Sequence, residues 1–232
     1  MNAGNSLQVA WLGRLAYAPA LARQETLVQQ KIDAPATTPD TLLLLEHEPV
    51  YTIGRTPDRS SLASAAVLPH PVETIHRGGQ ATYHGPGQLV GYPILDLGRR
   101  GKDLHVYLRF LEETLIAALA VYGVAGRRRE GLTGVWIGER KVASIGVGVR
   151  RWVSLHGFAI NVEGGAALTP FESITPCGLT GVRMTAVEPE AGRAIGVQAF
   201  AQTVGGMFGE RLGEKMPLTV PVPGAESGRS SD

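Results

Sequence analysis

Residues 134–162 read GVWIGERKVASIGVGVRRWVSLHGFAINV and carry a clear strand signal. Three runs rich in β-branched and aromatic residues, 135–137, 141–149 and 153–162, are separated by short connections, the first of which is the turn sequence Gly138-Glu139-Arg140. Short apolar runs joined by turns of this kind predict consecutive strands that pair antiparallel. The stretch therefore predicts a β-meander.

Helical patterns flank the meander on both sides. Residues 103–123 are typical of an amphipathic helix, with Asp103 as a plausible N-cap and Gly123 as the C-terminal glycine. Apolar residues recur there, and again before the C-terminus, at the three-to-four spacing of a helix face: Leu104, Leu108, Leu111, Leu115, Leu119 and Tyr122 in the first helix, and Val197, Phe200, Val204 and Phe208 in the second. Both helices are expected to bury that face.

The N-terminal part alternates in the same way. Residues 7–12, 42–45 and 50–53 predict strands, and Pro19 opens a helix between the first two. With the meander, this order predicts an α+β (mixed α/β) fold in which helices cover one side of a mixed sheet. The 232 residues suit a single domain over residues 1–216, followed by a flexible tail, 217–232, rich in proline, glycine and serine.

Composition narrows the class of protein. Hydrophobic residues make up 44% and charged residues 19% of the chain, which is typical of a soluble globular protein, and the net charge of +1 gives no reason to expect nucleic acid or membrane partners. No signal peptide pattern and no apolar run of about 20 residues is visible. The single cysteine excludes an internal disulfide and suits a reducing cytoplasm, so a cytoplasmic location is expected.

The most unusual stretch is residues 77–92, RGGQATYHGPGQLVGY. It contains five glycines between two β-type runs. Glycine allows positive φ and close approach of the backbone to a ligand. A hairpin connection would need only about two to five residues, whereas long ordered connections are often functional. The stretch therefore predicts a binding loop.

Several common sites are excluded by the same sequence. His47-Glu48 is not followed by the second histidine of a zinc-protease helix. One cysteine cannot build a multi-thiolate zinc site, and residues 85–88 lack the Gly-Lys-Ser/Thr of a phosphate-binding P-loop. Residues 85–91 lead into a strand pattern where a dinucleotide fingerprint requires a helix. Neither a metal nor a cofactor is predicted.

Two residues are candidates for chemistry. Cys177 lies between Pro176 and Gly178, and a rigid turn presents a thiol rather than packing it, although a lone cysteine can equally be a small buried hydrophobe. Lys141 begins a strand of small residues and is a cation that could raise the thiolate population of Cys177. The alternative is an exposed lysine at a strand end. Strand alternation predicts that its side chain faces the same way as Ala143 and Ile145.

Four blocks of the chain resemble the lipoyl(octanoyl) transferases, the octanoyl-[acyl carrier protein]:protein N-octanoyltransferases. The blocks, in order along the chain, are RGGQATYHGPGQL at 77–89, TGVW at 133–136 with KVASIG at 141–146, HGFAIN at 156–161, and ITPCGL at 174–179. They run from residue 77 to residue 179 of the chain. No departure from the family pattern is visible at the motif positions.

This resemblance implies a biotin/lipoate-protein-ligase-like fold and a catalytic pair in which Cys177 carries the acyl group and Lys141 lowers its thiol pKa and transfers protons. It implies octanoyl-acyl carrier protein as donor, and as acceptors the lipoyl domains of 2-oxoacid dehydrogenase complexes and the glycine cleavage H protein. The implied substrate-binding residues are Arg77, Gly78, Gly79, Gln80, Ala81, Thr82, Tyr83, His84, Ser144, Ile145, Gly146, Gly157, Phe158 and Ala159.

Two other functions remain open from the sequence. An ATP-dependent lipoate or biotin ligase of the same fold activates a free acid as its adenylate and does not need a thiol nucleophile, so Cys177 argues against it. A non-catalytic acyl-binding module would keep the glycine-rich loop but would have no need for Cys177 and Lys141. An ATP requirement would identify the ligase, and a covalent acyl adduct would identify the transferase.

Overall fold

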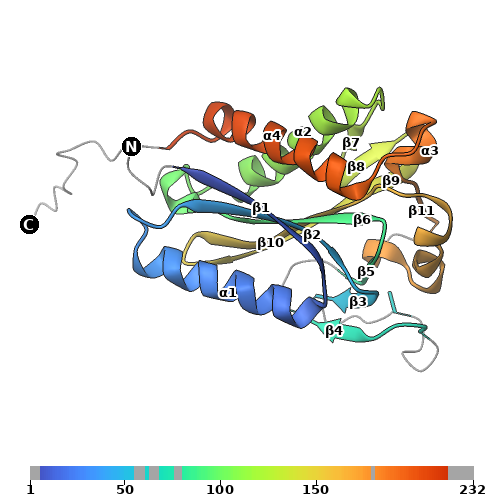
Figure 1. Ribbon diagram of the computed structural model, residues 1–232, viewed down its shortest axis with the longest axis horizontal. Coiled ribbons are helices and arrows are strands. Elements are labelled where there is room, and N and C mark those ends of the chain that lie inside the picture. The colour runs from blue at the N-terminus through green and yellow to red at the C-terminus, as the bar shows by residue number, and fades with distance from the viewer. Residues whose placement is uncertain (1–5, 55–60, 63–67, 76–79, 179–180, 219–232) are drawn as a thin grey trace, which may run out of the picture.

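The computed structural model describes residues 6–54, 61–62, 68–75, 80–178 and 181–218, except for the side chain of Cys177. Arg77, Gly78 and Gly79 and the predicted tail from residue 219 onward lie outside the described residues. Figure 1 shows a central twisted sheet with long helices on either side of it.

The central sheet has the strand order β1-β2-β6-β10-β9-β8-β7, with β11 beside β9. Its strands are β1 (Leu7–Leu15), β2 (Asp40–His47), β6 (Gln88–Ile94), β7 (Arg127–Arg129), β8 (Leu132–Ile137), β9 (Arg140–Arg150), β10 (Val153–Asn161) and β11 (Arg183–Met184). The β8–β9–β10 pairs are antiparallel, so the predicted meander is confirmed, while β1 and β2 pair in parallel and make the sheet mixed.

A second, smaller sheet has the order β4-β3-β5. It consists of β3 (Val50–Ile53), β4 (Val72–Thr74) and β5 (Thr82–His84). Strand β5 lies inside the glycine-rich stretch, so that stretch is not a loop throughout: it contributes a short strand before it turns at residues 85–87 into β6.

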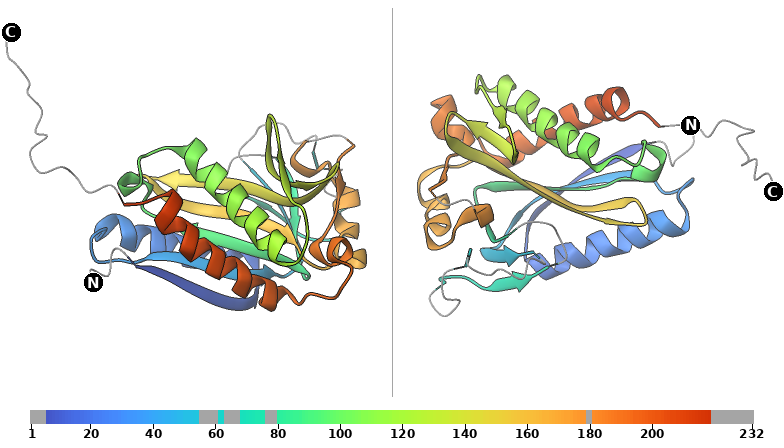
Figure 2. Two further views of the ribbon diagram at one scale, coloured as in Figure 1. Left: turned by 90° about the horizontal axis from the view of Figure 1, so that it is seen from above. Right: turned by 180° about the vertical axis from the view of Figure 1, so that it is seen from behind.

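Helices cover both faces of the central sheet, so the expectation of helices on one side was wrong. The helices are α1 (Tyr17–Asp33), α2 (Leu104–Val121), α3 (Val187–Ala191) and α4 (Val197–Lys215), with the short 3₁₀ turns η3 (Leu97–Arg99), η4 (Gly165–Ala167), η5 (Thr169–Ser173) and η6 (Pro176–Gly178). In both views of Figure 2, α2 and α4 lie together on one face and α1 lies on the other. The main apolar core lies under α2 and α4.

Helix α2 begins where the sequence predicts. The carboxylate of Asp103 accepts hydrogen bonds from the backbone N–H groups of His105 and Val106, the expected N-cap. The predicted apolar face is correct in its C-terminal half, where Leu111, Leu115 and Leu119 are buried. Leu104, at the first position of α2, is exposed instead.

Candidate active site

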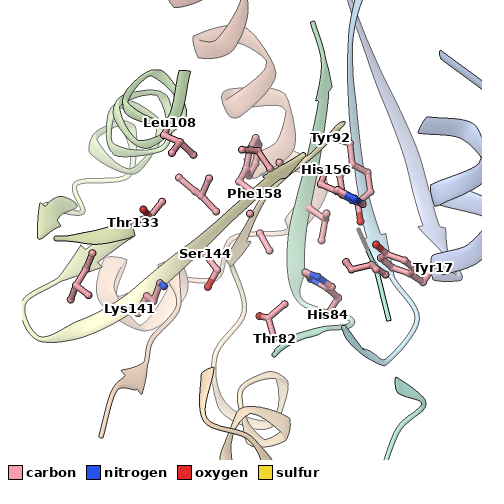
Figure 3. A pocket seen from close by; sticks show the side chains of 18 of the residues that line it. Tyr17, Thr82, His84, Tyr92, Leu108, Thr133, Lys141, Ser144, His156 and Phe158 are labelled. Carbon is pink, nitrogen blue, oxygen red and sulfur yellow. The ribbon is translucent and has the colours of Figure 1, made fainter. Parts of the chain in front are cut away.

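A cavity of about 350 Å³ opens beside the central sheet where β5, β6, β9 and β10 come together. In Figure 3, Lys141 and Thr133 lie on one side of this cavity, Tyr17, Tyr92 and His84 lie on the other, and Ser144 lies between them. The walls are mainly apolar, with Val90, Ile145 and Phe158 among the lining residues. A cavity of this size and character suits a small, largely apolar ligand group.

Lys141 reaches this cavity because β9 contains a β-bulge. Val135 of β8 pairs with Ala143, but the next residue, Trp136, pairs with Lys141, so Val142 is an extra residue on β9. Val142 and Ala143 both pack into the main core, whereas Lys141 lines the cavity with Ser144. The expectation that Lys141 and Ala143 face the same way was therefore wrong, since a bulge interrupts strand alternation.

The side chain of Lys141 is buried against Trp136 and Gly134 of the neighbouring strand β8. Lys141 is 1% exposed, which excludes the alternative of an exposed strand-end lysine. Its Nζ lies 5.5 Å from the ring centroid of Trp136, within reach of a cation–π interaction. A Cβ on Gly134 would lie 2.8 Å from Cε of Lys141, so glycine is needed at this position. The backbone N–H of Gly134 donates instead to Glu112 of α2.

The backbone of Cys177 lies in the tight turn η6, as the Pro-Cys-Gly sequence predicts. Gly178 has φ +69° and donates its N–H to the carbonyl of Thr175 at 3.0 Å. A Cβ on Gly178 would lie 2.0 Å from Oε1 of Gln80, so the glycine-rich stretch packs directly against the turn that carries the cysteine.

The chain then returns from this turn to the strand of Lys141. Met184 of β11 is the parallel partner of Lys141, and the N–H of Thr185 donates to the carbonyl of Lys141 at 3.0 Å. The strand that follows the cysteine turn is thereby fixed to the strand of Lys141, although the two are far apart in the sequence.

The predicted substrate-binding residues on β9 and β10 face one another. Phe158 pairs with Ile145, and Ala159 pairs with Ser144. These residues line the cavity, together with the predicted residues Gly146, Gly157, Thr82 and His84.

The other predicted residues lie elsewhere. Ala81, just before β5, and Tyr83, within it, alternate with Thr82 and His84 and pack into a separate apolar cluster with Phe171. Gln80 contacts the cysteine turn rather than the cavity. Whether each residue binds substrate remains a prediction.

Some cavity residues were missed from the sequence. Tyr92 and His156 lie within the quoted motif stretches, so their position beside predicted residues was an available signal. Tyr17, at the start of α1, and Leu108, on α2, come from helices whose sequences gave no indication of a site.

Behind Tyr92 lies a buried histidine. Nδ1 of His47 lies 3.0 Å from the carbonyl oxygen of Leu15, and Nε2 lies 2.7 Å from the hydroxyl of Tyr92. A carbonyl can only accept, so Nδ1 donates to Leu15 and Nε2 accepts the Tyr92 O–H. Burial lowers the pKa of His47 from 6.5 to about 4, so the ring is neutral at pH 7.

Within the described residues, no group of three or more His, Cys, Asp or Glu side chains is placed to hold a metal ion. None of the described helices is both long and apolar enough to span a membrane.

Sequence comparison identifies close relatives. Residues 16–209 match the family described as the lipoyl protein ligase A/B catalytic domain. The octanoyltransferase of Geobacter metallireducens is 50% identical over 207 residues, covering 89% of this chain and 94% of that protein. The octanoyltransferase of Synechococcus elongatus is 52% identical over 182 residues, covering 75% of this chain and 76% of that protein.

Solved structures agree on the fold. A bipartite lipoate protein ligase from Thermoplasma acidophilum superposes with a TM-score of 0.59 at 18% identity, over 91% of this chain and 83% of that one. The biotin protein ligase of Aquifex aeolicus with biotin and ATP gives a TM-score of 0.57 at 14% identity, over 91% and 73%. These likenesses establish the predicted biotin/lipoate-ligase-like fold. The family match and the sequence relatives show that the chain is an acyltransferase that belongs to the lipoyl protein ligase A/B catalytic domain family, in its lipoyl(octanoyl) transferase group.

Proposed function

We propose that this enzyme transfers an octanoyl group from octanoyl-acyl carrier protein, through a thioester on Cys177, to the ε-amine of a lysine on lipoyl domains. The observation that carries the proposal is Lys141, a buried lysine at the wall of an apolar cavity whose strand pairs with β11, the strand that follows the turn bearing the chain's one cysteine. The acyl tail occupies the cavity, and the reacting carbonyl lies near Lys141. The octanoyl group is supported by the relatives named octanoyltransferases. Lipoyl domains as acceptors are supported by the lipoyl protein ligase family match and by the similarity to the archaeal lipoate protein ligase that was described with its E2 lipoyl domain.

In the first half-reaction, the Cys177 thiolate attacks the carbonyl carbon of the donor thioester. The bond from that carbon to the carrier sulfur breaks, and the carrier thiolate takes a proton from the Lys141 ammonium. The octanoyl group is then on Cys177, and Lys141 is a neutral amine. Because one thioester replaces another, this step is nearly isoenergetic.

In the second half-reaction, the amine of the acceptor lysine attacks the Cys177 thioester. The carbon–sulfur bond breaks, the electron pair stays on sulfur, and the proton of the amine passes to Lys141. The ammonium of Lys141 then again stabilises the Cys177 thiolate. The amide product is more stable than a thioester, so no ATP is required.

Polar groups near the cavity can donate hydrogen bonds to the carbonyl oxygen of the octanoyl group, which becomes negatively charged during each attack. Backbone N–H groups of the glycine-rich stretch would stabilise the oxyanion at each tetrahedral stage. Thr82 is a further donor: its hydroxyl lines the cavity and is buried, and it has no hydrogen-bond partner within the described part of the chain. A cytoplasmic location is a further expectation, based on the single cysteine.

The test compares two donors with a purified lipoyl domain as acceptor. Octanoyl-acyl carrier protein without ATP should give the octanoylated domain, whereas free octanoate with ATP should not. The reverse pattern would identify an ATP-dependent ligase, and transfer from neither donor would leave a non-catalytic binding module.

A further inference from the structure

Two tyrosine rings form the wall of the cavity that lies opposite Lys141. Tyr17, at the start of α1, and Tyr92, on β6, are both buried and both line the cavity. In Figure 3 they lie across the cavity from Lys141, with Ser144 between them and the lysine. An acyl tail whose carbonyl lies near Lys141 therefore points its last carbons toward these rings.

The register of the sheet gives the length of this path. Ser144 of β9 pairs with Ala159 of β10. The antiparallel pairing of β10 with β6 places Tyr92 level with Gly157, two residues or about 7 Å farther along β10. An extended octanoyl tail is longer than this, so a tail that begins on the Lys141 side of Ser144 reaches Tyr92.

The imidazole of His47 packs behind this wall. Its ring centroid lies 5.3 Å from that of Tyr17, 5.9 Å from that of Tyr92 and 5.7 Å from that of His84, a third residue of the cavity wall. His47 is 0% exposed. Protein interiors are close-packed, so the three rings cannot move back into the space that the imidazole fills.

Hydrogen bonds fix the histidine and Tyr92 to the main chain. Tyr92 donates its hydroxyl to Nε2 of His47, and Nδ1 of His47 donates to the carbonyl of Leu15. Leu15 is the last residue of β1, and Tyr17 begins α1 two residues later. The hydroxyl of Tyr92 is therefore tied, through His47, to the segment that positions Tyr17.

The backbone of β10 closes the same end of the cavity and has no room to move back. His156, which lines the cavity, has φ +57°, and its N–H donates to Oε1 of Gln24 on α1 at 2.9 Å. A Cβ on Gly157 would lie 2.3 Å from the carbonyl oxygen of Gly91, so β10 already contacts β6 there. The side chain behind the two tyrosines is therefore the part of this end whose removal would lengthen the cavity.

We propose that His47 is a specificity-determining residue, which limits the acyl tail to the length of an octanoyl group by bracing Tyr17 and Tyr92. This inference rests on the octanoyl transfer proposed above and adds to it the group that limits the length of the tail. A pocket wall that cannot move discriminates against one extra methylene by about 10- to 200-fold. His47 acts through the two tyrosines and does not touch the tail itself.

The variant His47→Ala removes the brace. With an equimolar mixture of octanoyl- and decanoyl-acyl carrier protein and a lipoyl domain as acceptor, the masses of the acylated domain give the ratio of kcat/KM for the two donors. The wild-type enzyme should transfer mainly octanoyl. In His47→Ala the decanoyl-to-octanoyl ratio should rise at least about tenfold, because two further methylenes become buried at about fourfold each. An unchanged ratio would overturn the proposal.

Leu44→Ala is the matched control. Leu44 is a buried residue of the same strand, β2, but it packs into the main core under α2 and α4, on the opposite face of the sheet from Tyr92. This variant also removes a buried side chain, and it should leave the ratio unchanged. A shift as large as in His47→Ala would mean that a general loosening of the fold, and not loss of the brace, changes the preference.

His47→Leu separates the bulk of the ring from its hydrogen bonds. Leucine fills a similar volume but cannot accept the hydrogen bond from Tyr92, so the preference for octanoyl should be kept. A decanoyl-to-octanoyl ratio as high as in His47→Ala would overturn the steric role of His47. If His47→Ala does not fold, His47→Val, which vacates less volume, should shift the ratio in the same direction by a smaller factor, and no shift would overturn the proposal.

Binding of free fatty acids tests the wall independently of transfer. Calorimetric titration with octanoate and with decanoate should show the affinity for decanoate, relative to octanoate, at least about tenfold higher in His47→Ala than in the wild-type protein. The same relative affinity in both proteins would overturn the inference. If no donor gives an acylated domain, the proposed function is contradicted, and the titration still tests the wall.

Discussion

Gly134 and Lys141 are complementary across the β8–β9 pair: the side chain of Lys141 occupies the volume that a Cβ on Gly134 would take. That Cβ would lie 2.8 Å from Cε of Lys141 and 2.5 Å from the carbonyl oxygen of Ala143. Gly134 also has φ +126°, a conformation that side-chain-bearing residues rarely adopt. The position of the lysine therefore depends on a glycine of the neighbouring strand β8.

Gly134→Ala should displace Lys141 from the cavity wall. We expect kcat/KM for octanoyl transfer to fall at least about tenfold, because the lysine no longer holds its position for proton transfer. Gly138→Ala is the matched control, since Gly138 also has positive φ, +56°, but a Cβ there meets nothing within 4 Å. Equal loss of activity in the two variants, measured by single-turnover transfer, would mean that backbone strain and not displacement of Lys141 is responsible.

Lys141→Met, which keeps the length of the side chain and removes its charge, should raise the pKa of the Cys177 thiol. An ordinary cysteine has a pKa near 8.5, and a nearby cation lowers it by stabilising the thiolate. Because the chain contains one cysteine, the pH profile of alkylation reports on Cys177 alone. The profile should move to higher pH in Lys141→Met and should stay unchanged in the exposed-lysine control Lys102→Met. An unchanged profile in both variants would exclude the electrostatic role of Lys141.

Mild acid should destabilise the protein through His47. Its folded pKa of about 4 lies below the usual 6.5, so between these values the unfolded chain binds a proton that the folded chain does not. The free energy of unfolding therefore falls as pH falls, by about 2 kcal/mol from this residue between pH 7 and pH 5. Urea unfolding of His47→Gln should show a correspondingly weaker pH dependence, with the exposed-histidine variant His105→Gln as control. The same slope in His47→Gln and in the unsubstituted protein would contradict this assignment.

Two basic clusters lie at opposite ends of β9, and only one lies near the lysine. Arg127 pairs with Trp136, which pairs with Lys141, so residues 127–129 lie two strands, or about 10 Å, from the lysine. Arg150 lies nine residues along β9, about 30 Å away. The proximal cluster is partly neutralised, since Arg127 and Arg129 share Glu139. Its distance from Lys141 therefore favours the cluster at residues 127–129 as the docking surface for the acyl carrier protein, although its net charge is reduced.

Charge reversal at Arg127 and Arg129 should raise KM for octanoyl-acyl carrier protein several-fold at low salt and leave KM for a short octanoyl thioester unchanged, because charge steering acts on an acidic protein partner and is screened by salt. The same reversal at Arg150 and Arg151 is the matched control and should have a much smaller effect. A larger effect from the distal pair, or equal salt sensitivity for both donors, would contradict docking at the proximal cluster.

The sequence was sufficient for the elements that depend on local pattern. Short runs rich in β-branched and aromatic residues predicted β8, β9 and β10, and the Asp103 cap with apolar residues at three-to-four spacing predicted α2. These sequence patterns predict the elements correctly because each pattern reflects which residues of a single segment are buried. The turn at Pro176-Cys177-Gly178 was also predictable, since proline and glycine restrict the backbone locally.

The features that the sequence did not predict depend on contacts between segments that are distant in the sequence. The bulge at Val142 exists only in the pairing with β8, so strand alternation misplaced Lys141. The face that α1 covers is decided by the order of strands in the sheet, which no segment encodes alone. Tyr17 lines the cavity because α1 begins beside that cavity. The sequence at the start of a helix does not show which residues of other elements it will contact.

The central claim, that Cys177 carries the octanoyl group, is tested most directly by intact-mass measurement. The purified enzyme mixed with octanoyl-acyl carrier protein should gain the mass of one octanoyl group, and the adduct should disappear, with octanoylation of the acceptor, when a lipoyl domain is added. Cys177→Ala should show neither the adduct nor the transfer. A Cys177→Ala variant that transfers octanoyl at the wild-type rate would contradict the account.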